Sequence, residues 1–164
     1  MTLGVVILVL VTLQRLGELW LSDRNTRRLL ARGAREVAPG HYPLIVAVHA
    51  SWLAALWWLA PGRAIDPFWL AAFILLQLGR VWVIATLGER WTTRIIVLPR
   101  APLVRAGPYR FVSHPNYLVV IGEIAALPLA FGLWLFAVIW TVLNAAVLVI
   151  RIREENQALG RLRA

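Results

Sequence analysis

Two short polar segments of this 164-residue chain hold the side chains best suited to chemistry. The first carries Tyr109, His114 and Tyr117 just before a long apolar run, and the second carries Arg151 and Glu155 just after it. Gly-Pro and His-Pro pairs in the first segment favour a turn followed by the start of a helix. Backbone N–H groups at a helix start attract an anionic group, and aromatic faces attract a cation.

The elements that must position these segments are membrane-spanning helices. Hydrophobic residues make up 60% of the chain and charged residues 15%, against about 45–50% and about 25% in soluble domains. A helix needs about 20 apolar residues to cross a bilayer, and Pro128 with Gly132 divides the last, longer run. One tilted, kinked helix over this run is the alternative. We predict one all-α, membrane-embedded domain over 1–164 with five transmembrane helices, the last two a tight hairpin, at about 2–21, 43–60, 67–87, 117–131 and 134–150.

Arginine supplies all 17 basic residues of the chain. Most arginines fall in 24–35, 90–110 and 151–163, and only Arg63 lies between the second and third helices. The positive-inside rule then places the N-terminus outside and the C-terminus, the loop 88–116 and the tail 151–164 in the cytosol. We expect this basic face to meet anionic lipid headgroups and not nucleic acid. The sequence has no cysteine, which excludes disulfides and thiolate metal sites, and no metal site is predicted.

The predicted hairpin brings the two polar segments together, although they are distant in sequence. If the last helix continues past the membrane, Arg151 and Glu155 share one of its faces, one turn apart. Both residues then lie beside His114 and Tyr117 at the start of the preceding helix. The alternative is that neither segment has a chemical role. The first segment would then be only a helix cap and a turn, and the second only a charged, solvated stretch.

Several ionisable or polar side chains lie inside the apolar segments, where they are costly. Arg15 and Glu18 are three residues apart on one helical face and can pair. Arg80 and Glu123 are candidates for a cavity or a buried ion pair, and the sequence does not say whether they are partners. We expect the side chains of the remaining polar residues to form hydrogen bonds between helices. These residues are Gln14, His49, Gln77 and Asn144.

The ordered set of motifs resembles the isoprenylcysteine carboxyl methyltransferase family of integral membrane methyltransferases. The resemblance is strong over about 88–160 and extends weakly through the five-helix layout. A further stretch, 24–43, resembles a bacterial branch whose members methylate lipidic polyketides such as alkylpyrones and alkylresorcinols, often beside a type III polyketide synthase. The motifs that carry the family resemblance are Leu103-Val104, Gly107-Pro108-Tyr109, His114-Pro115-Asn116-Tyr117, and Arg151-Ile152 with Glu154-Glu155 and Leu159.

The resemblance implies S-adenosylmethionine as the methyl donor, bound in a cytosol-facing pocket, and a lipophilic acceptor that enters from the bilayer. Arg151 corresponds to the position that holds the acceptor's oxygen. For a phenol or enol acceptor, the candidate bases are His114 and Glu154. The positions that correspond to cofactor contacts are Pro102, Leu103, Val104, Tyr109, His114, Pro115, Asn116, Tyr117 and Glu155.

One residue departs from the family pattern. Ser113 stands where the carboxyl methyltransferases usually have Arg before His-Pro, and the loss of this cation argues against a prenylcysteine carboxylate as acceptor. The alternatives are a true prenylcysteine carboxyl methyltransferase, a phospholipid N-methyltransferase, an NADPH-dependent sterol-type reductase and a non-catalytic membrane scaffold. The Arg- and Ala-rich composition suggests a GC-rich bacterium, in which prenylated protein substrates are less expected. We expect the protein in the bacterial inner membrane, with the active site facing the cytosol.

Overall fold

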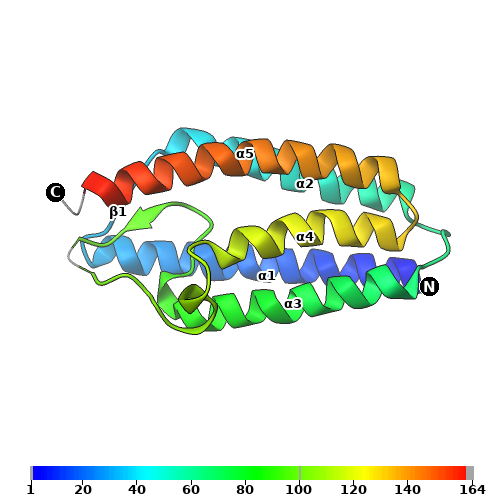
Figure 1. Cartoon of the computed structure of the whole chain (residues 1–164), viewed down its shortest axis with the longest axis horizontal. Helices are drawn as coiled ribbons and strands as arrows, with labels where there is room; N and C mark the ends of the chain where they lie inside the picture. The colour runs from blue at the N-terminus through cyan, green and yellow to red at the C-terminus, as the bar shows by residue number, and fades with distance from the viewer. Residues whose placement is uncertain (1, 100, 162–164) are drawn as a thin grey trace.

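The computed structural model describes residues 2–99 and 101–161 of the chain. Within these residues the backbone forms five α-helices that run alternately up and down an elongated bundle (Figure 1). The predicted all-α fold with five helices is therefore confirmed. The helices are α1 (Leu3–Ala31), α2 (Tyr42–Leu59), α3 (Pro67–Leu87), α4 (Pro115–Ala130) and α5 (Trp134–Arg161).

Four of these helices, α1, α2, α3 and α5, are long and apolar enough to cross a membrane. Large apolar side chains point outward along them, as Leu10, Leu75 and Val142 do with exposed fractions of 60%, 67% and 63%. The chain is an integral membrane protein. α4 has 16 residues, or about 24 Å of helix, which is less than the roughly 30 Å of the hydrocarbon core. Over half of its residues are buried against the other helices.

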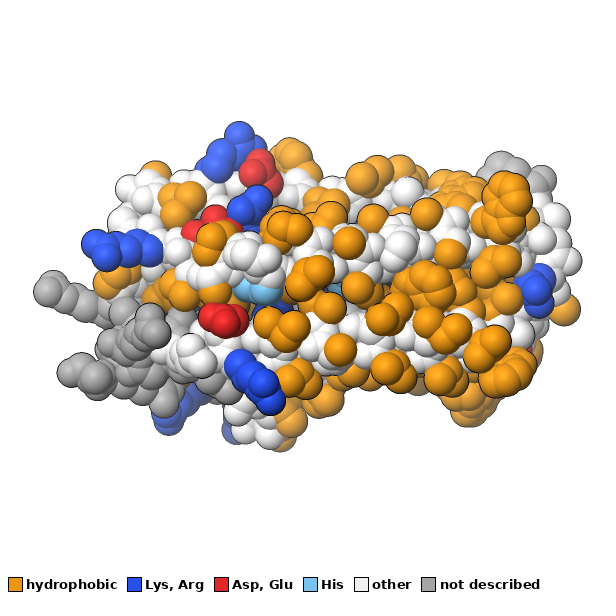
Figure 2. Space-filling view, turned by 90° about the horizontal axis from the view of Figure 1, so that it is seen from above, with side chains coloured by type: hydrophobic (Ala, Val, Ile, Leu, Met, Phe, Trp, Pro, Cys, Tyr) orange, Lys and Arg blue, Asp and Glu red, His pale blue; other side chains and the backbone are white. Residues whose placement is uncertain are grey.

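The connections between helices divide between the two ends of the bundle. The α1–α2 connection, the long α3–α4 connection and the end of α5 lie together at one end, while the N-terminus lies at the other (Figure 1). Basic and acidic side chains gather toward the first end, and hydrophobic side chains cover most of the rest of the face in Figure 2. We call the first end the polar end of the bundle.

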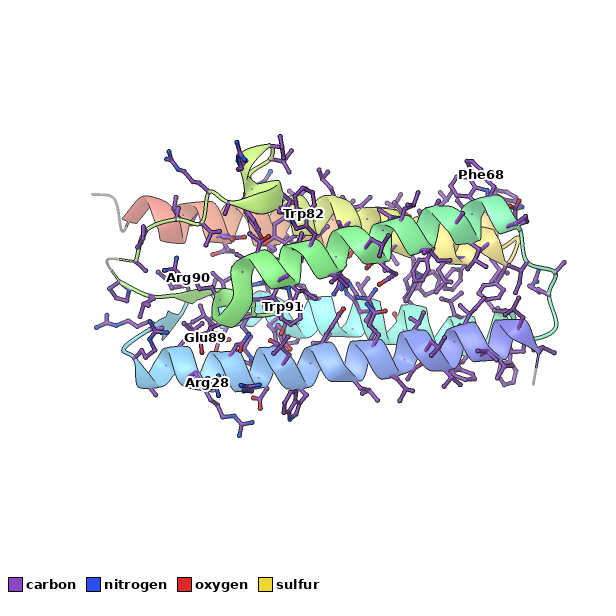
Figure 3. The ribbon with its side chains drawn as sticks, turned by 90° about the horizontal axis from the view of Figure 1, so that it is seen from below. Arg28, Phe68, Trp82, Glu89, Arg90 and Trp91 are labelled. Atoms are coloured by element: carbon purple, nitrogen blue, oxygen red, sulfur yellow. The ribbon has the colours of Figure 1, made fainter. Side chains whose placement is uncertain are left out.

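Two helices extend beyond the ends that the apolar pattern predicts. α1 continues past residue 21 to Ala31, because its second half packs on the α3–α4 connection. Asn25 donates from Nδ2 to the carbonyls of Trp91 at 2.9 Å and Gly88 at 3.2 Å. Arg28 meets Glu89 at 3.2 Å across the gap between α1 and the end of α3 (Figure 3). α5 likewise continues through the predicted tail to Arg161.

Short elements shape the polar end. The strand β1 (Arg35–Glu36) pairs antiparallel with β2 (Ile96–Val97) and so joins the α1–α2 connection to the α3–α4 connection. Three 3₁₀ turns complete these connections. They are η1 (Pro39–His41), η2 (Gly88–Arg90) and η3 (Gly107–Arg110).

The turn between α4 and α5 confirms that the last apolar run is a hairpin of two helices. The N–H of Phe131 bonds to the carbonyl of Pro128 at 3.0 Å, and the N–H of Gly132 bonds to that of Leu129 at 2.9 Å. Gly132 has φ +69°, a conformation that glycine adopts without a steric penalty. The chain therefore reverses within three residues and sets α5 antiparallel to α4.

A network of buried charges joins α1, α3 and α4. Arg80 donates to both carboxylate oxygens of Glu18 at 2.6 Å and to Glu123 at 3.1 Å, so Arg80 and Glu123 are partners. Arg15 completes the network, at 3.1 Å from Glu18 and 2.7 Å from Glu123. The expected pairing of Arg15 with Glu18 is confirmed. Two arginines and two glutamates thus compensate one another in the apolar interior, where an unpaired charge is very costly.

The other polar residues of the apolar segments behave in different ways. Gln14 donates to Gln77 at 2.6 Å, which confirms a hydrogen bond between α1 and α3. His49 was expected to bond across helices, but its Nδ1 lies 2.8 Å from the carbonyl of Ile45 on its own helix. That prediction is wrong because a carbonyl one turn back is already within reach of the ring. Asn144 is buried, and its Nδ2 has no hydrogen-bond partner among the described residues.

Candidate active site

Tyr117 is the centre of the polar cluster at the start of α4. Pro115 occupies the first turn of that helix, where its missing N–H costs nothing, and Tyr117 follows with only 9% of its surface exposed. Its hydroxyl donates a hydrogen bond to a carboxylate oxygen of Glu155 and accepts one from Nε of Arg151 at 2.9 Å. The phenol therefore lies between a carboxylate and a guanidinium that both belong to α5.

The extension of α5 past the apolar run supplies these two side chains. Arg151 and Glu155 lie one turn apart on one face, and the antiparallel hairpin aims that face at the start of α4. Arg151 also donates from Nη1 to the backbone carbonyl of Thr93 at 2.6 Å. The predicted convergence of the two polar segments is thus what the structure shows.

His114 and Asn116 precede Tyr117 at the start of α4. The His114 ring stacks on the Tyr117 ring, with centroids 5.1 Å apart and planes 13° from parallel. Its Nδ1 lies 3.8 Å from a carboxylate oxygen of Glu155, beyond hydrogen-bond distance. The side-chain oxygen of Asn116 is buried without a hydrogen-bond partner in the part of the chain that the structure describes.

An apolar groove of about 340 Å³ runs between α4 and α5 and ends at His114 and Tyr117. Leu118 on its rim has 58% of its surface exposed, so the groove opens on the outer, apolar surface of the bundle. The side chains that line it are those of Val112, Ser113, His114, Tyr117, Leu118, Ile121, Ala145, Leu148, Val149 and Ile152.

Tyr109 belongs to η3, which is held against α3 by a close approach at Gly107. A Cβ at Gly107 would lie 2.4 Å from Oγ1 of Thr86 and 3.1 Å from Nε1 of Trp82, and φ at Gly107 is +53°. Only glycine fits this contact without displacing its neighbours. Burial, together with the negative charge of Glu155, raises the pKa of Tyr109 to about 12.

The remaining predicted site residues lie apart from the Tyr117 hydrogen bonds. The carbonyl of Pro102 accepts a hydrogen bond from Arg90 at 2.6 Å, and Leu103 is exposed. Val104 is half-buried in the same connection. Glu154 makes no hydrogen bond or ion pair within the described residues, which separates it from its neighbour Glu155.

The sequence did not point to Thr93 and Ser22, which contribute to the cluster through Arg151. Ser22 lies on α1, is 2% exposed, and hydrogen-bonds to both the backbone and the hydroxyl of Thr93. A serine in the second half of α1 carries no motif, and only its burial in the folded chain marks it.

The sequence from residue 69 to residue 161 matches the model of the isoprenylcysteine carboxyl methyltransferase family. This match covers more than half of the chain and contains Tyr117, Arg151 and Glu155. The chain belongs to the isoprenylcysteine carboxyl methyltransferase family. Membership indicates that this protein is a membrane methyltransferase, and it confirms the family that the sequence motifs indicated.

Two relatives of this family member match along nearly their whole length. The uncharacterized protein YpbQ of Bacillus subtilis (strain 168) is 33% identical over 167 residues, which cover 93% of this chain and 94% of that protein. An uncharacterized protein of Haemophilus influenzae is 27% identical over 154 residues, which cover 90% of each chain. No solved structure matches. Because the alignments cover 93% and 90% of this chain, the similarity to both relatives extends through α2 and into α1, which precede the region that the family model covers.

Proposed function

We propose that this protein transfers a methyl group from S-adenosylmethionine to an oxygen of a lipophilic acceptor. The observation that carries the proposal is the convergence of Arg151 and Glu155 on the Tyr117 hydroxyl, at the polar end of an apolar groove. One carboxylate suits a cationic cofactor, one guanidinium suits an anionic oxygen, and the groove suits a hydrocarbon chain. Family membership supports the reaction class.

The residues of the cluster fit the charged groups of S-adenosylmethionine. Glu155 can accept hydrogen bonds from the ammonium, and Asn116 is a further contact that we assign by family resemblance. The start of α4 favours the carboxylate through its backbone dipoles. The rings of Tyr109 and Tyr117 can face the cationic half of the cofactor. Pro102, Leu103, Val104, His114 and Pro115 complete the contacts that we assign by family resemblance.

Arg151 is the residue that we assign to the acceptor oxygen. Its Nε and Nη1 are bonded to Tyr117 and Thr93, whereas Nη2 makes no hydrogen bond within the described residues. That nitrogen is available to hold and stabilise an oxyanion. When bound, S-adenosylmethionine supplies an electrophilic methyl group, so that a C–O bond forms, the S–C bond breaks and S-adenosylhomocysteine leaves. The contribution of this chain is to orient the acceptor oxygen and to exclude water from it.

The nature of the acceptor decides whether a base is needed. A carboxylate is already ionised, whereas a phenol or enol must lose its proton. His114 lines the groove and is the base that we favour over Glu154, which does not line it. Ser113 also lines the groove and adds no cation there. We therefore favour a phenol or enol lipid, such as an alkylresorcinol or alkylpyrone, over a prenylcysteine carboxylate.

We also propose the orientation of the protein in the membrane. The arginine-rich connections and the end of α5 lie at the polar end of the bundle. The positive-inside rule then places this end, with the site, in the cytosol of a bacterial cell, and it places the N-terminus on the outer side of the inner membrane. Anionic lipid headgroups are the expected partners of this basic surface.

Calorimetric titration of the detergent-solubilised protein with S-adenosylhomocysteine tests the cofactor assignment. We expect saturable binding by the wild type, about 10- to 100-fold weaker binding by Glu155→Gln, and nearly unchanged binding by its matched control, Glu154→Gln. Arg151→Ala should retain binding and lose turnover. Absence of binding by the wild type at millimolar concentration contradicts the proposal, and equal effects of Glu155→Gln and Glu154→Gln contradict the assignment of Glu155.

A further inference from the structure

The Arg151 guanidinium is held by a chain of hydrogen bonds that begins on α1. Ser22 accepts a hydrogen bond from the backbone N–H of Thr93 at 2.8 Å, and the hydroxyls of the two residues are also 2.8 Å apart. The carbonyl of Thr93 in turn accepts from Nη1 of Arg151 at 2.6 Å. We propose that Ser22 and Thr93 are positioning residues that aim Arg151 at the acceptor oxygen. This inference rests on the proposed function.

Ser22 is suited to this task because it is buried and contacts Thr93 at two points. Its side chain is 2% exposed, and its single hydroxyl oxygen holds Thr93 at two points, the backbone N–H and Oγ1. Two contacts from one buried oxygen fix both the position and the orientation of the Thr93 residue. Loss of the oxygen removes the acceptor of the part-buried Thr93 N–H together with the contact to Oγ1, so Thr93 loses both of the bonds that Ser22 provides.

Thr93 is anchored from other elements as well. The hydroxyl of Tyr42, at the start of α2, lies 3.2 Å from Oγ1 of Thr93. The next residue, Arg94, pairs with Glu36 at 2.9 Å and places its guanidinium 4.5 Å from the Tyr42 ring centroid. Contacts from β1 and from the start of α2 therefore fix the position of the Thr93 carbonyl at the polar end.

The orientation of Arg151 follows from two anchors on two different nitrogens. Nη1 is bonded to Thr93 and Nε to Tyr117, and the guanidinium is planar, so these bonds fix the direction of Nη2. A displaced Thr93 would turn this plane about the Tyr117 contact. A shift of about 1 Å at a reacting group costs on the order of 100-fold in rate. Ser22 thus affects acceptor turnover through Thr93 and Arg151, without touching the acceptor.

Steady-state kinetics of Ser22→Ala, Thr93→Ser and Thr26→Val, each in the full chain, test the proposal. Thr26 lies one turn beyond Ser22 on α1 and is buried, with a hydroxyl that has no partner among the described residues, which makes Thr26→Val a matched control. Ser22→Ala should lower kcat/KM for the acceptor about 10- to 100-fold. Its affinity for S-adenosylhomocysteine should stay within about twofold of the wild type. Thr26→Val should resemble the wild type, and Thr93→Ser, which keeps the hydroxyl, should lose less kcat/KM than Ser22→Ala does.

A second readout does not depend on turnover. In protein labelled with ¹⁵N-arginine, rotation about the Nε–Cζ bond of Arg151 can be followed by NMR, with Arg151→Lys to assign the signal. Ser22→Ala should speed this rotation severalfold, and Thr26→Val should not.

The proposal is overturned if Ser22→Ala has the same rotation rate and the same kcat/KM as the wild type. An equal loss of cofactor affinity and acceptor turnover without a change in rotation also overturns it, because that marks a general folding role. A wild type without methyltransferase activity refutes the proposed function, while the rotation still decides the positioning of Arg151.

Discussion

Nε of Arg151 donates a hydrogen bond to the Tyr117 hydroxyl at 2.9 Å, and this contact joins the end of α5 to the start of α4. The same hydroxyl donates to Glu155, so one phenol couples the residue that we assign to the acceptor with the residue that we assign to the cofactor. A short hairpin places both helices in antiparallel contact, which is why residues over thirty positions apart meet here.

Tyr117→Phe removes the hydroxyl and keeps the ring that stacks on His114. We expect Arg151 and Glu155 each to lose one partner, at a cost of about 1–3 kcal/mol in transition-state stabilisation, or roughly 5- to 150-fold in kcat/KM. Turnover and S-adenosylhomocysteine binding should be measured together. The coupling role of the hydroxyl is refuted if both quantities match the wild type.

Gly107→Ala tests whether the close packing of η3 against α3 is required. The new Cβ meets Thr86 at 2.4 Å in addition to the strain of a positive φ, whereas Gly33, with φ +85°, has open space around its Cβ position. Gly33→Ala therefore controls for backbone strain alone, which costs about 1–2 kcal/mol. We expect Gly107→Ala to lower both Tm and turnover by more than Gly33→Ala does. Equal effects of the two changes would show that the close approach to α3 is not required.

The buried charge network predicts a large effect from a single neutralisation. Arg80→Met leaves the Glu18 carboxylate with only Arg15 as a cationic partner in the apolar interior. Removing one partner of a buried pair costs about 3–5 kcal/mol, and removing both costs less. Thermal unfolding in detergent should show a much lower Tm for Arg80→Met and a partial recovery in Arg80→Met/Glu18→Gln. A double variant no more stable than Arg80→Met would argue against compensation between these charges.

If the groove between α4 and α5 binds the acceptor, blocking it should weaken acceptor binding and leave cofactor binding unchanged. Ile121→Trp places a large ring in the groove, whereas Val138→Trp adds the same ring on an exposed face of α5 that does not line it. We expect the first change to raise KM for a long-chain acceptor about tenfold or more, since lost hydrocarbon burial costs about 0.8 kcal/mol per CH₂. Cofactor affinity should not change. An unaltered KM in Ile121→Trp would exclude the groove as the acceptor site.

The sequence predicted the parts of this site that depend on helix periodicity and topology. Arg151 and Glu155 share a face because they are four residues apart, and Pro128 with Gly132 forces the hairpin that brings Tyr117 to them. Both features follow from the helix repeat and from the turn residues, which can be identified without knowledge of the tertiary contacts.

The remaining features required the folded chain. α1 reaches Ala31 because Asn25 bonds to the carbonyls of Gly88 and Trp91, and no apolar pattern marks that contact. The contact of Ser22 with Thr93 joins residues 71 positions apart through a hydrogen bond that has no sequence motif. The pairing of Arg80 with Glu123 likewise depends on how α3 packs on α4.

Transfer of a labelled methyl group in vesicles tests the central claim most directly. The wild type is incubated with S-adenosylmethionine that carries a deuterated methyl group and with separate acceptors: an alkylresorcinol, an alkylpyrone, a prenylcysteine and phosphatidylethanolamine. Mass spectrometry then locates the label, and NADPH oxidation is followed in parallel. The proposed function predicts one labelled methyl on an oxygen of the alkylresorcinol or alkylpyrone, with Arg151→Ala inactive. Label on the headgroup amine, oxidation of NADPH, or no transfer to any acceptor would contradict it.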